Sequence, residues 1–343
     1  MSDIPQEFDD PLLTTAMGNG ADGPMWFDRA YFNLFNAPGF PAVVVGAAHY
    51  PNAGEGRGVS DGYAIVLSGE SQRNLRFSQA LGDPERIGPF HWQVVDPFRE
   101  WTLELNSPET GVEMRARFTA TTVPNFLDPI AANNESGGGT RFAHFFQRGR
   151  YEGELVVDGT TWSLDGWTGM RDRSRGLREA RARLGMHLWG NFRTDDGSCL
   201  AFNYNETRDG SVSHLDGGLM TESVLGTRVT QVRHAFEVNE DRELISGVMV
   251  VTMEDGEEFD LGVEALSRGV FMAGGGYDGR HGVARGTVVE GETWSLDQSF
   301  DPASLGLMLV DKPCVVRCGG TEVSNIFEFA LSRSTSYVYR TNL

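Results

Sequence analysis

Short segments in which apolar and polar residues alternate recur along most of the chain and predict β-strands. The clearest is residues 112–121, where Val112, Met114, Ala116 and Phe118 alternate with charged or polar residues. Because successive side chains of a strand point to opposite faces, this segment is predicted to have one buried and one wet face. Other predicted strands lie at residues 41–49, 62–68, 151–157, 186–192, 199–204, 229–238, 247–253, 308–316 and 322–330.

Turn-forming sequences such as DDG at residues 195–197 and RDG at 208–210 separate these segments and are typical of hairpins. About twenty strands exceed what one sheet usually holds and favour two units in tandem. We therefore predict an all-β fold of two antiparallel barrels, residues 1–183 and 184–343. Residues 176–185 are expected to connect them as a short helix or as a loop.

Composition and charge narrow the classes of partner. The 343 residues include 29 Lys and Arg against 48 Asp and Glu, a formal net charge of −19, which would repel a nucleic acid backbone. The longest apolar run, residues 41–48, is less than half of the ~20 residues that a membrane-spanning helix needs. The first fifteen residues lack the regions of a signal peptide. We therefore expect a cytoplasmic protein with no nucleic acid partner and no membrane span.

The three cysteines are Cys199, Cys314 and Cys318, an odd number without a CxxC spacing. They cannot all form disulfides, so free thiols in a reducing compartment are expected. Pairing of Cys314 with Cys318 across a hairpin is the alternative.

The densest group of charges lies in residues 165–178, DGWTGMRDRSRGLR, where arginines gather in an otherwise acidic chain. One interpretation is that Asp172 is held among guanidinium groups such as Arg171, beside Trp167, and acts as an acid or base or orients one. The other is an exposed connector whose salt bridges contribute little stability.

A second group of polar and aromatic residues follows directly. Three predicted strands each place two of them on one face: His187 with Trp189, Tyr204 with Glu206, and His214 with Asp216. If the strands are neighbours, these six residues could line a common barrel interior as a polar pocket with aromatic walls. Some of them are also residue types that bind metal, but no HExxH or HxH spacing supports a metal site.

Two histidines of the N-terminal half, His49 and His144, adjoin aromatic residues and could face a cavity. The simpler interpretation for each is a core or rim side chain with a satisfied imidazole. The sequence contains no GxSxG elbow, no GxxxxGK[ST] loop and no strand–GxGxxG–helix unit, which argues against serine hydrolysis and nucleotide binding.

The run YEGELVVDG…LDGWTGMRDRSRGLR, followed by GMHLWGNF and YNETRDG, resembles the tandem lipocalin-like (calycin) family. That family includes carotenoid hydratases, kievitone hydratase, related cyclases and uncharacterised bacterial members. Its signature stands here as Gly169, Arg171, Asp172, Arg173, Ser174, Gly176 and Arg178, with Arg173 where the family usually has His. The resemblance implies two lipocalin-like barrels, a ligand cavity, and acid–base chemistry without a redox cofactor, with Asp172 matching the family's acid candidate.

We therefore expect a cofactor-independent lyase or hydratase acting on a hydrophobic small molecule, with a plant-derived phenolic favoured over an isoprenoid. The candidate catalytic residues are Asp172, His187, Tyr204 and His214. The candidate substrate-binding residues are Trp167, Trp189, Arg171, Glu206, Asp216, His49 and His144. A non-catalytic carrier of a lipid or pigment, and a pericyclase-like pocket that only shapes its substrate, are the alternatives. No cofactor or metal is expected, and a second copy of the chain is left open as a partner.

Overall fold

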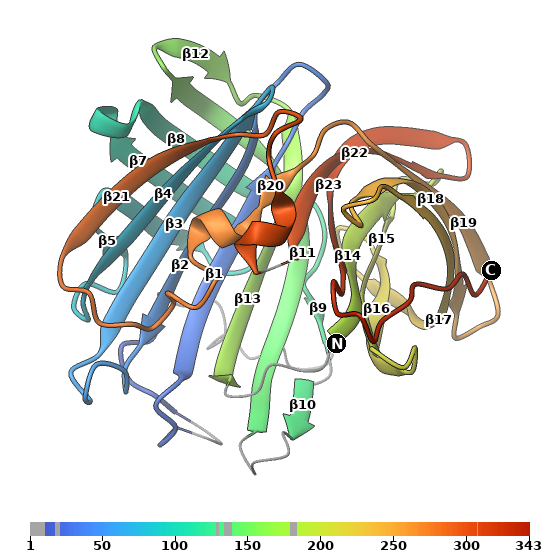
Figure 1. Cartoon of the computed structure of the whole chain (residues 1–343), viewed down its shortest axis with the longest axis horizontal. Coiled ribbons are helices and arrows are strands. Elements are labelled where there is room, and N and C mark those ends of the chain that lie inside the picture. The colour runs from blue at the N-terminus through green and yellow to red at the C-terminus, as the bar shows by residue number, and fades with distance from the viewer. Residues whose placement is uncertain (1–10, 18–20, 128–129, 134–138, 179–183, 307) are drawn as a thin grey trace.

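Twenty-three β-strands in two antiparallel sheets make up most of the computed structural model (Figure 1). The structure describes residues 11–17, 21–127, 130–133, 139–178, 184–306 and 308–343. Within these residues the only helices are three 3₁₀ turns, namely η2 (Pro108–Thr110), η3 (Met272–Gly275) and η4 (Pro302–Leu305).

The first sheet is a curled half-barrel whose main path has eleven strands. In spatial order these are β21 (Val288–Ser295), β4 (Ser71–Ala80), β3 (Val59–Ser68), β2 (Ala42–Tyr50), β1 (Trp26–Leu34), β13 (Trp167–Arg178), β11 (Gly139–Val157), β8 (Val112–Ala120), β7 (Glu100–Ser107), β6 (Phe90–Asp96) and β5 (Arg86–Ile87). Three short strands also pair with β11, namely β9 (Asn125–Phe126), β10 (Ile130–Asn133) and β12 (Thr160–Ser163).

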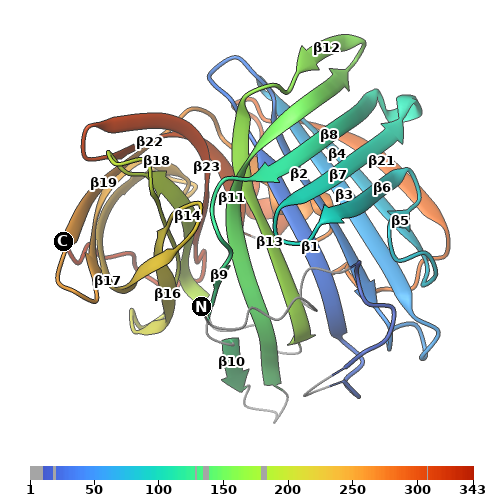
Figure 2. The ribbon, with the colours of Figure 1, turned by 180° about the vertical axis from the view of Figure 1, so that it is seen from behind.

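The second sheet is a closed barrel of eight strands, seen beside the half-barrel in Figure 2. Around the barrel these are β14 (Leu184–Arg193), β15 (Cys199–Thr207), β16 (Val212–Met220), β17 (Leu225–Val238), β18 (Leu244–Met253), β19 (Glu258–Ala265), β22 (Val310–Cys318) and β23 (Thr321–Leu331). Pairing of β19 with β22 closes the ring, and the short β20 (Val270–Phe271) pairs with β22.

The predicted all-β fold of two antiparallel units is confirmed, although the first unit is an open half-barrel. Residues 176–178 end β13 and residues 184–185 begin β14, so both flanks of the expected connector are strand. Its middle, residues 179–183, lies outside the described residues, as does the predicted boundary at residue 183. Strand β21 comes from the C-terminal half and pairs with β4 of the first sheet. The two-domain division stays a prediction.

Strand alternation gives four apolar clusters among the described residues, of which the smallest lies around Phe27 and Tyr50. One fills the concave face of the half-barrel and another fills the closed barrel. The third lies between the two units, where Tyr31 and Phe146 of the first sheet meet Trp189 and Ile326 of the barrel. The outer face of the half-barrel and the outer surface of the barrel are therefore both buried where they meet.

A strap formed by β20, η3 and β21 carries the chain from the barrel back onto the first sheet. Gln72 accepts a hydrogen bond from the backbone N–H of Phe271 at 2.7 Å and donates to its carbonyl oxygen at 3.0 Å. Arg76 donates to the carbonyl oxygen of Gly274 at 2.8 Å. The strap is thus attached to the sheet by buried hydrogen bonds between the side chains of Gln72 and Arg76 and its backbone.

Cys199, Cys314 and Cys318 are all free and buried, which confirms the prediction of free thiols. Burial raises the pKa of Cys199 to about 11 and that of Cys314 to about 12. In the part of the chain that the structure describes, no helix has both the length and the apolar character needed to cross a membrane.

Candidate functional site

Asp172 and His144 lie on the face of the first sheet that meets the barrel. Strand register places Asp172 of β13 opposite Phe146 of β11, and His144 opposite Ser174. His144 Nε2 lies 3.3 Å from Asp172 Oδ2, and the Asp172 side chain is 17 % exposed. Both ring nitrogens of His144 and Oδ1 of Asp172 are buried without a hydrogen bond to any described residue. This imidazole–carboxylate pair therefore keeps free bonding capacity.

The arginines next to Asp172 point to the opposite, concave face. Arg171 donates from Nε and Nη2 to Gln147 Oε1 at 3.0 and 2.9 Å, and its guanidinium lies over the rings of Trp101 and Phe145. The expectation that guanidinium groups and Trp167 surround Asp172 is wrong, because neighbouring residues of one strand face opposite sides. Trp167 packs in the concave core against Phe40.

Arg173, which stands where the resembling family has His, forms a buried ion pair. Its Nε and Nη2 each donate to a carboxylate oxygen of Asp28 at 2.8 Å, and Arg175 adds a third contact at 3.0 Å. Burial alone would raise the pKa of Asp28, but the charge and hydrogen bonds of Arg173, with the charge of Arg175, hold that pKa below its usual value. In this part of the charge-rich segment, Arg173 and Arg175 therefore link β13 to Asp28 of β1 and have a structural role.

His187 and Trp189 approach from the outer surface of the barrel. His187 Nδ1 is hydrogen-bonded to Asn205 Oδ1 at 2.7 Å, and its Nε2 is hydrogen-bonded to Glu328 Oε1. The ring of Trp189 lies 5.4 Å from that of Tyr31, edge to face, and 6.4 Å from that of His144. The side chains of His187 and Glu328 are 13 % and 12 % exposed. Trp189 thus packs the barrel surface that also carries His187 against Tyr31 and His144 of the first sheet.

Tyr31 connects the first sheet to a pair of acidic residues on the barrel. Its hydroxyl donates to Asp311 Oδ2 at 2.5 Å, and Asp311 is the cross-strand partner of Glu328. Burial, and then the charge of Glu328, raise the pKa of Asp311 well above its usual value. A neutral Asp311 carboxyl is therefore the state that this environment favours.

Tyr204 and Glu206 lie inside the closed barrel, away from this interface. The Tyr204 hydroxyl donates to Glu206 Oε1 at 2.5 Å, and the same oxygen lies 3.1 Å from His234 Nε2. Burial, followed by the bond to Glu206, raises the pKa of Tyr204. Register explains the separation, because His187 pairs with Asn205 while Tyr204 pairs with Leu188. The six residues expected to line one interior are divided between the inside and the outside of the barrel.

His214 and Asp216 lie on the outer side of β16. Asp216 is buried and accepts two hydrogen bonds from Arg228 Nη2 at 2.9 and 3.0 Å. His214 is the cross-strand neighbour of Asn205, which in turn binds His187. Among the described residues no three His, Cys, Asp or Glu side chains are grouped so that they could hold a metal ion.

His49 points into the concave face of the half-barrel, apart from the interface. Its Nδ1 is hydrogen-bonded to Ser60 Oγ at 2.8 Å, and its ring lies near that of Trp92. Burial lowers the pKa of His49 to about 4, so the ring is neutral at physiological pH. His49 has the environment of a satisfied core histidine.

The structure adds Tyr31, Asp311 and Glu328 to the candidates. Each stands within a largely apolar strand, as in LVDKPCVV and SNIFEFA. A lone acid inside an apolar strand segment is the sequence signal that could have identified Asp311 and Glu328, because burying a carboxyl is costly. Which groups they would meet depended on the packing of the two units.

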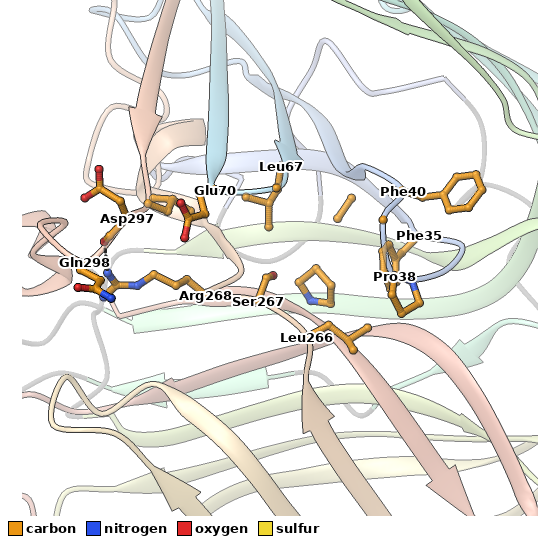
Figure 3. A pocket seen from close by; sticks show the side chains of 15 residues that line it. Phe35, Pro38, Phe40, Leu67, Glu70, Leu266, Ser267, Arg268, Asp297 and Gln298 are labelled. Carbon is orange, nitrogen blue, oxygen red and sulfur yellow. Dashed lines mark hydrogen bonds between the residues drawn. The ribbon is translucent and has the colours of Figure 1, made fainter.

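A cleft of about 540 Å³ opens farther along the same interface (Figure 3). Apolar side chains such as Phe35, Leu67 and Leu266 line one part, and Glu70, Arg268, Asp297 and Gln298 gather at the other. Phe35 follows Tyr31 by four residues along the chain, so the cleft adjoins the same outer face of the sheet. None of the residues predicted from sequence lines it.

The chain belongs to the family described as "Family of unknown function (DUF8625)", which matches residues 7–337. It is similar in structure to the crystal structure of a "putative AttH" from Nitrosomonas europaea, with a TM-score of 0.58 and 11 % sequence identity. That similarity covers 91 % of this chain and 93 % of the other. It shows a lipocalin-like, AttH-type fold. No curated protein matches the sequence.

Proposed function

We propose that this protein is a cofactor-independent lyase or hydratase that transfers protons to and from a hydrophobic small molecule between its two units. The observation that carries this proposal is a set of buried polar atoms that converge on one interface without partners. They are His144 Nδ1 and Nε2, Asp172 Oδ1, Trp189 Nε1 and Asp311 Oδ1. Because buried polar atoms are nearly always hydrogen-bonded, such a concentration is typical of a place where a ligand binds.

The barrel side supplies an acid. Asp311 is buried and favours its neutral form, and it adjoins Glu328, which is bonded to His187. Both neighbours of His187 offer oxygen acceptors, so a doubly protonated imidazole would donate to both. A proton held by this group of residues could pass to a substrate at the partly exposed His187 or Glu328.

The opposite side supplies a base. The His144–Asp172 pair lies on the first sheet, with the His144 ring 6.4 Å from that of Trp189, and has unused bonding capacity. In hydration of a double bond, one carbon takes a proton from an acid while a base takes a proton from the attacking water. Elimination is the reverse. Two separate proton carriers on facing surfaces suit either direction.

The aromatic surroundings favour an unsaturated or phenolic substrate. The rings of Tyr31 and Phe146 each meet that of Trp189 edge to face, and the three could stabilise positive charge that develops on a substrate. The sequence resemblance to carotenoid hydratases and kievitone hydratase supports the same reaction class. The polar groups favour a plant-derived phenolic over an isoprenoid hydrocarbon. The free thiols support a reducing, cytoplasmic location.

Two other functions would use the same interface differently. A carrier of a lipid or pigment would bind its ligand without turnover. A pericyclase-like pocket would catalyse through shape, so that no single side chain would be essential.

The test is turnover of a panel of hydroxycinnamic acids, flavonoids and isoprenoid alkenes, followed by mass spectrometry. Asp172→Asn and Glu328→Gln should each lower the rate about a hundredfold or more, the scale of general acid–base catalysis. Asp260→Asn, an exposed change on β19, is the matched control and should keep the rate. Turnover that survives both site variants within a few-fold would contradict the acid–base assignment and favour a shaping pocket. Binding without turnover in the unmodified protein would favour a carrier.

A further inference from the structure

Arg29 is a buried cation without an anionic partner. It lies on β1, is only 7 % exposed, and shares the outer face of the sheet with Tyr31. Its Nη2 donates to the Tyr50 hydroxyl at 2.6 Å, while its Nε has no hydrogen-bond partner. Among the described residues no carboxylate lies within ion-pair distance of it. Burying a guanidinium in this way is costly unless something else compensates its charge.

The groups in contact with Arg29 hold it in place but include no carboxylate among the described residues. Its guanidinium carbon lies 5.4 Å from the ring centre of Phe27 and 5.1 Å from that of Tyr277. Such cation–π contacts are attractive, but they do not neutralise the cation. The buried Arg173 on the opposite face differs, because Asp28 binds it with both oxygens.

Two acids share this face of the sheet, Asp172 on β13 and Asp61 on β3. Asp172 lies beside His144, and Asp61 accepts a hydrogen bond from the backbone N–H of Gly282 at 2.5 Å. Neither forms an ion pair with Arg29. The guanidinium therefore remains available to an anion from outside the chain.

Strand register places Arg29 next to the proposed site. Arg29 pairs with Ser174 of β13, and Ser174 pairs with His144 of β11. Asp172 is two residues from Ser174 and so shares its face. Arg29 and His144 thus lie on either side of Ser174, and Asp172 lies on the same face, two residues from Ser174 along β13.

We propose that Arg29 binds a carboxylate group of the substrate, so that the substrate is an apolar or aromatic carboxylic acid and not a neutral hydrocarbon. This inference rests on the proposed function for the location of the reaction. A carboxylate matches the fork of a guanidinium and would place a counter-charge in direct contact with Arg29, which no described residue does. It would also hold the body of the substrate against Trp189 and within reach of His144 and Asp172.

The test compares binding of trans-cinnamate with binding of methyl trans-cinnamate, a neutral compound of similar shape, by isothermal titration calorimetry at pH 7. The unmodified protein should bind the acid about tenfold or more tightly than the ester, the range expected for a hydrogen bond to a charged group. Arg29→Gln should abolish that preference, and Arg29→Lys should retain part of it. Arg73→Gln is the control, because Arg73 pairs with Asp158 away from the interface, and it should keep the preference.

Circular dichroism and thermal unfolding establish that each variant is folded, and the acid–ester comparison in the unmodified protein needs no variant. Equal affinities there, no binding of the acid up to millimolar concentration, or an unchanged preference in folded Arg29→Gln would overturn the inference. Those results would leave turnover and its dependence on Asp172 intact. Failure of the proposed function would instead appear as absent turnover with the acid preference preserved.

Discussion

Asp311 and Glu328 lie opposite each other on β22 and β23, and both face the interface between the barrel and the half-barrel. Burial and the charge of Glu328 both raise the pKa of Asp311. Glu328 binds His187 and Asp311 accepts a hydrogen bond from Tyr31. The two carboxyl groups therefore connect Tyr31 of the half-barrel with His187 of the barrel.

Replacing Asp311 with Asn should make the stability of the protein less dependent on pH. The raised pKa of Asp311 means that the native state binds its proton more tightly than the unfolded state. Its contribution is fully present below pH ~4 and is lost as pH rises toward the native pKa, at about 1.4 kcal/mol per pH unit. The free energy of unfolding, measured with urea, should fall more between pH 5 and pH 8 in the unmodified protein than in Asp311→Asn. Parallel pH profiles would contradict the neutral carboxyl.

Replacing Asp28 with Asn should strongly destabilise the half-barrel. Arg173 is buried and would lose the carboxylate that accepts hydrogen bonds from its Nε and Nη2, a change that typically costs about 3–5 kcal/mol. Because the native pKa of Asp28 is lowered, the stabilisation that it provides is present at neutral pH and is lost as pH falls through that pKa. Chemical unfolding at pH 7 measures the effect.

The control for Asp28 is Asp158→Asn, which weakens an ion pair with Arg73 whose carboxylate is 62 % exposed. It should cost less than about 1 kcal/mol, as exposed pairs usually do. Similar losses of unfolding free energy in the two variants would mean that the Asp28–Arg173 pair does not stabilise the half-barrel more than an exposed pair does.

Replacing Tyr204 with Phe should lower stability without lowering turnover per folded molecule. The change removes a donor to the buried Glu206, which should cost about 1–3 kcal/mol. The proposed reaction takes place outside the barrel, so the rate should follow the folded fraction measured by circular dichroism. A rate loss comparable with that of Asp172→Asn, in a folded variant, would restore Tyr204 as a catalytic candidate.

Replacing Gly274 with Ala should loosen the strap between the two units. An added Cβ would lie 1.9 Å from Asn74 Oδ1 and 2.8 Å from Gln72 Nε2, the side chain that binds Phe271. Overpacking of this kind typically costs about 1–3 kcal/mol. Gly82→Ala is the matched control, because its Cβ would meet nothing closer than 3.9 Å. Equal melting temperatures for the two variants would show that the strap tolerates the extra methyl group.

Strand alternation made part of the site predictable, and the same rule shows where the sequence argument failed. His187 and Trp189 share a face, as predicted, and so do Tyr204 and Glu206. Their strands are also neighbours, as supposed. What failed was the assumption that both pairs face the same side. Whether residue 187 pairs with residue 204 or residue 205 depends on register, and a shift of one residue exchanges the two faces.

The sequence by itself determined the all-β fold, the local strands and the alternation along each of them, because these depend on neighbours a few residues apart. Only the tertiary structure decided that the first sheet remains open, that β21 returns to it, and that Asp172 and His144 lie on the face that meets the barrel. Tyr31 and Asp311 are 280 residues apart and meet through their side chains. No local pattern encodes such a contact, because it results from the packing of one curved sheet against another.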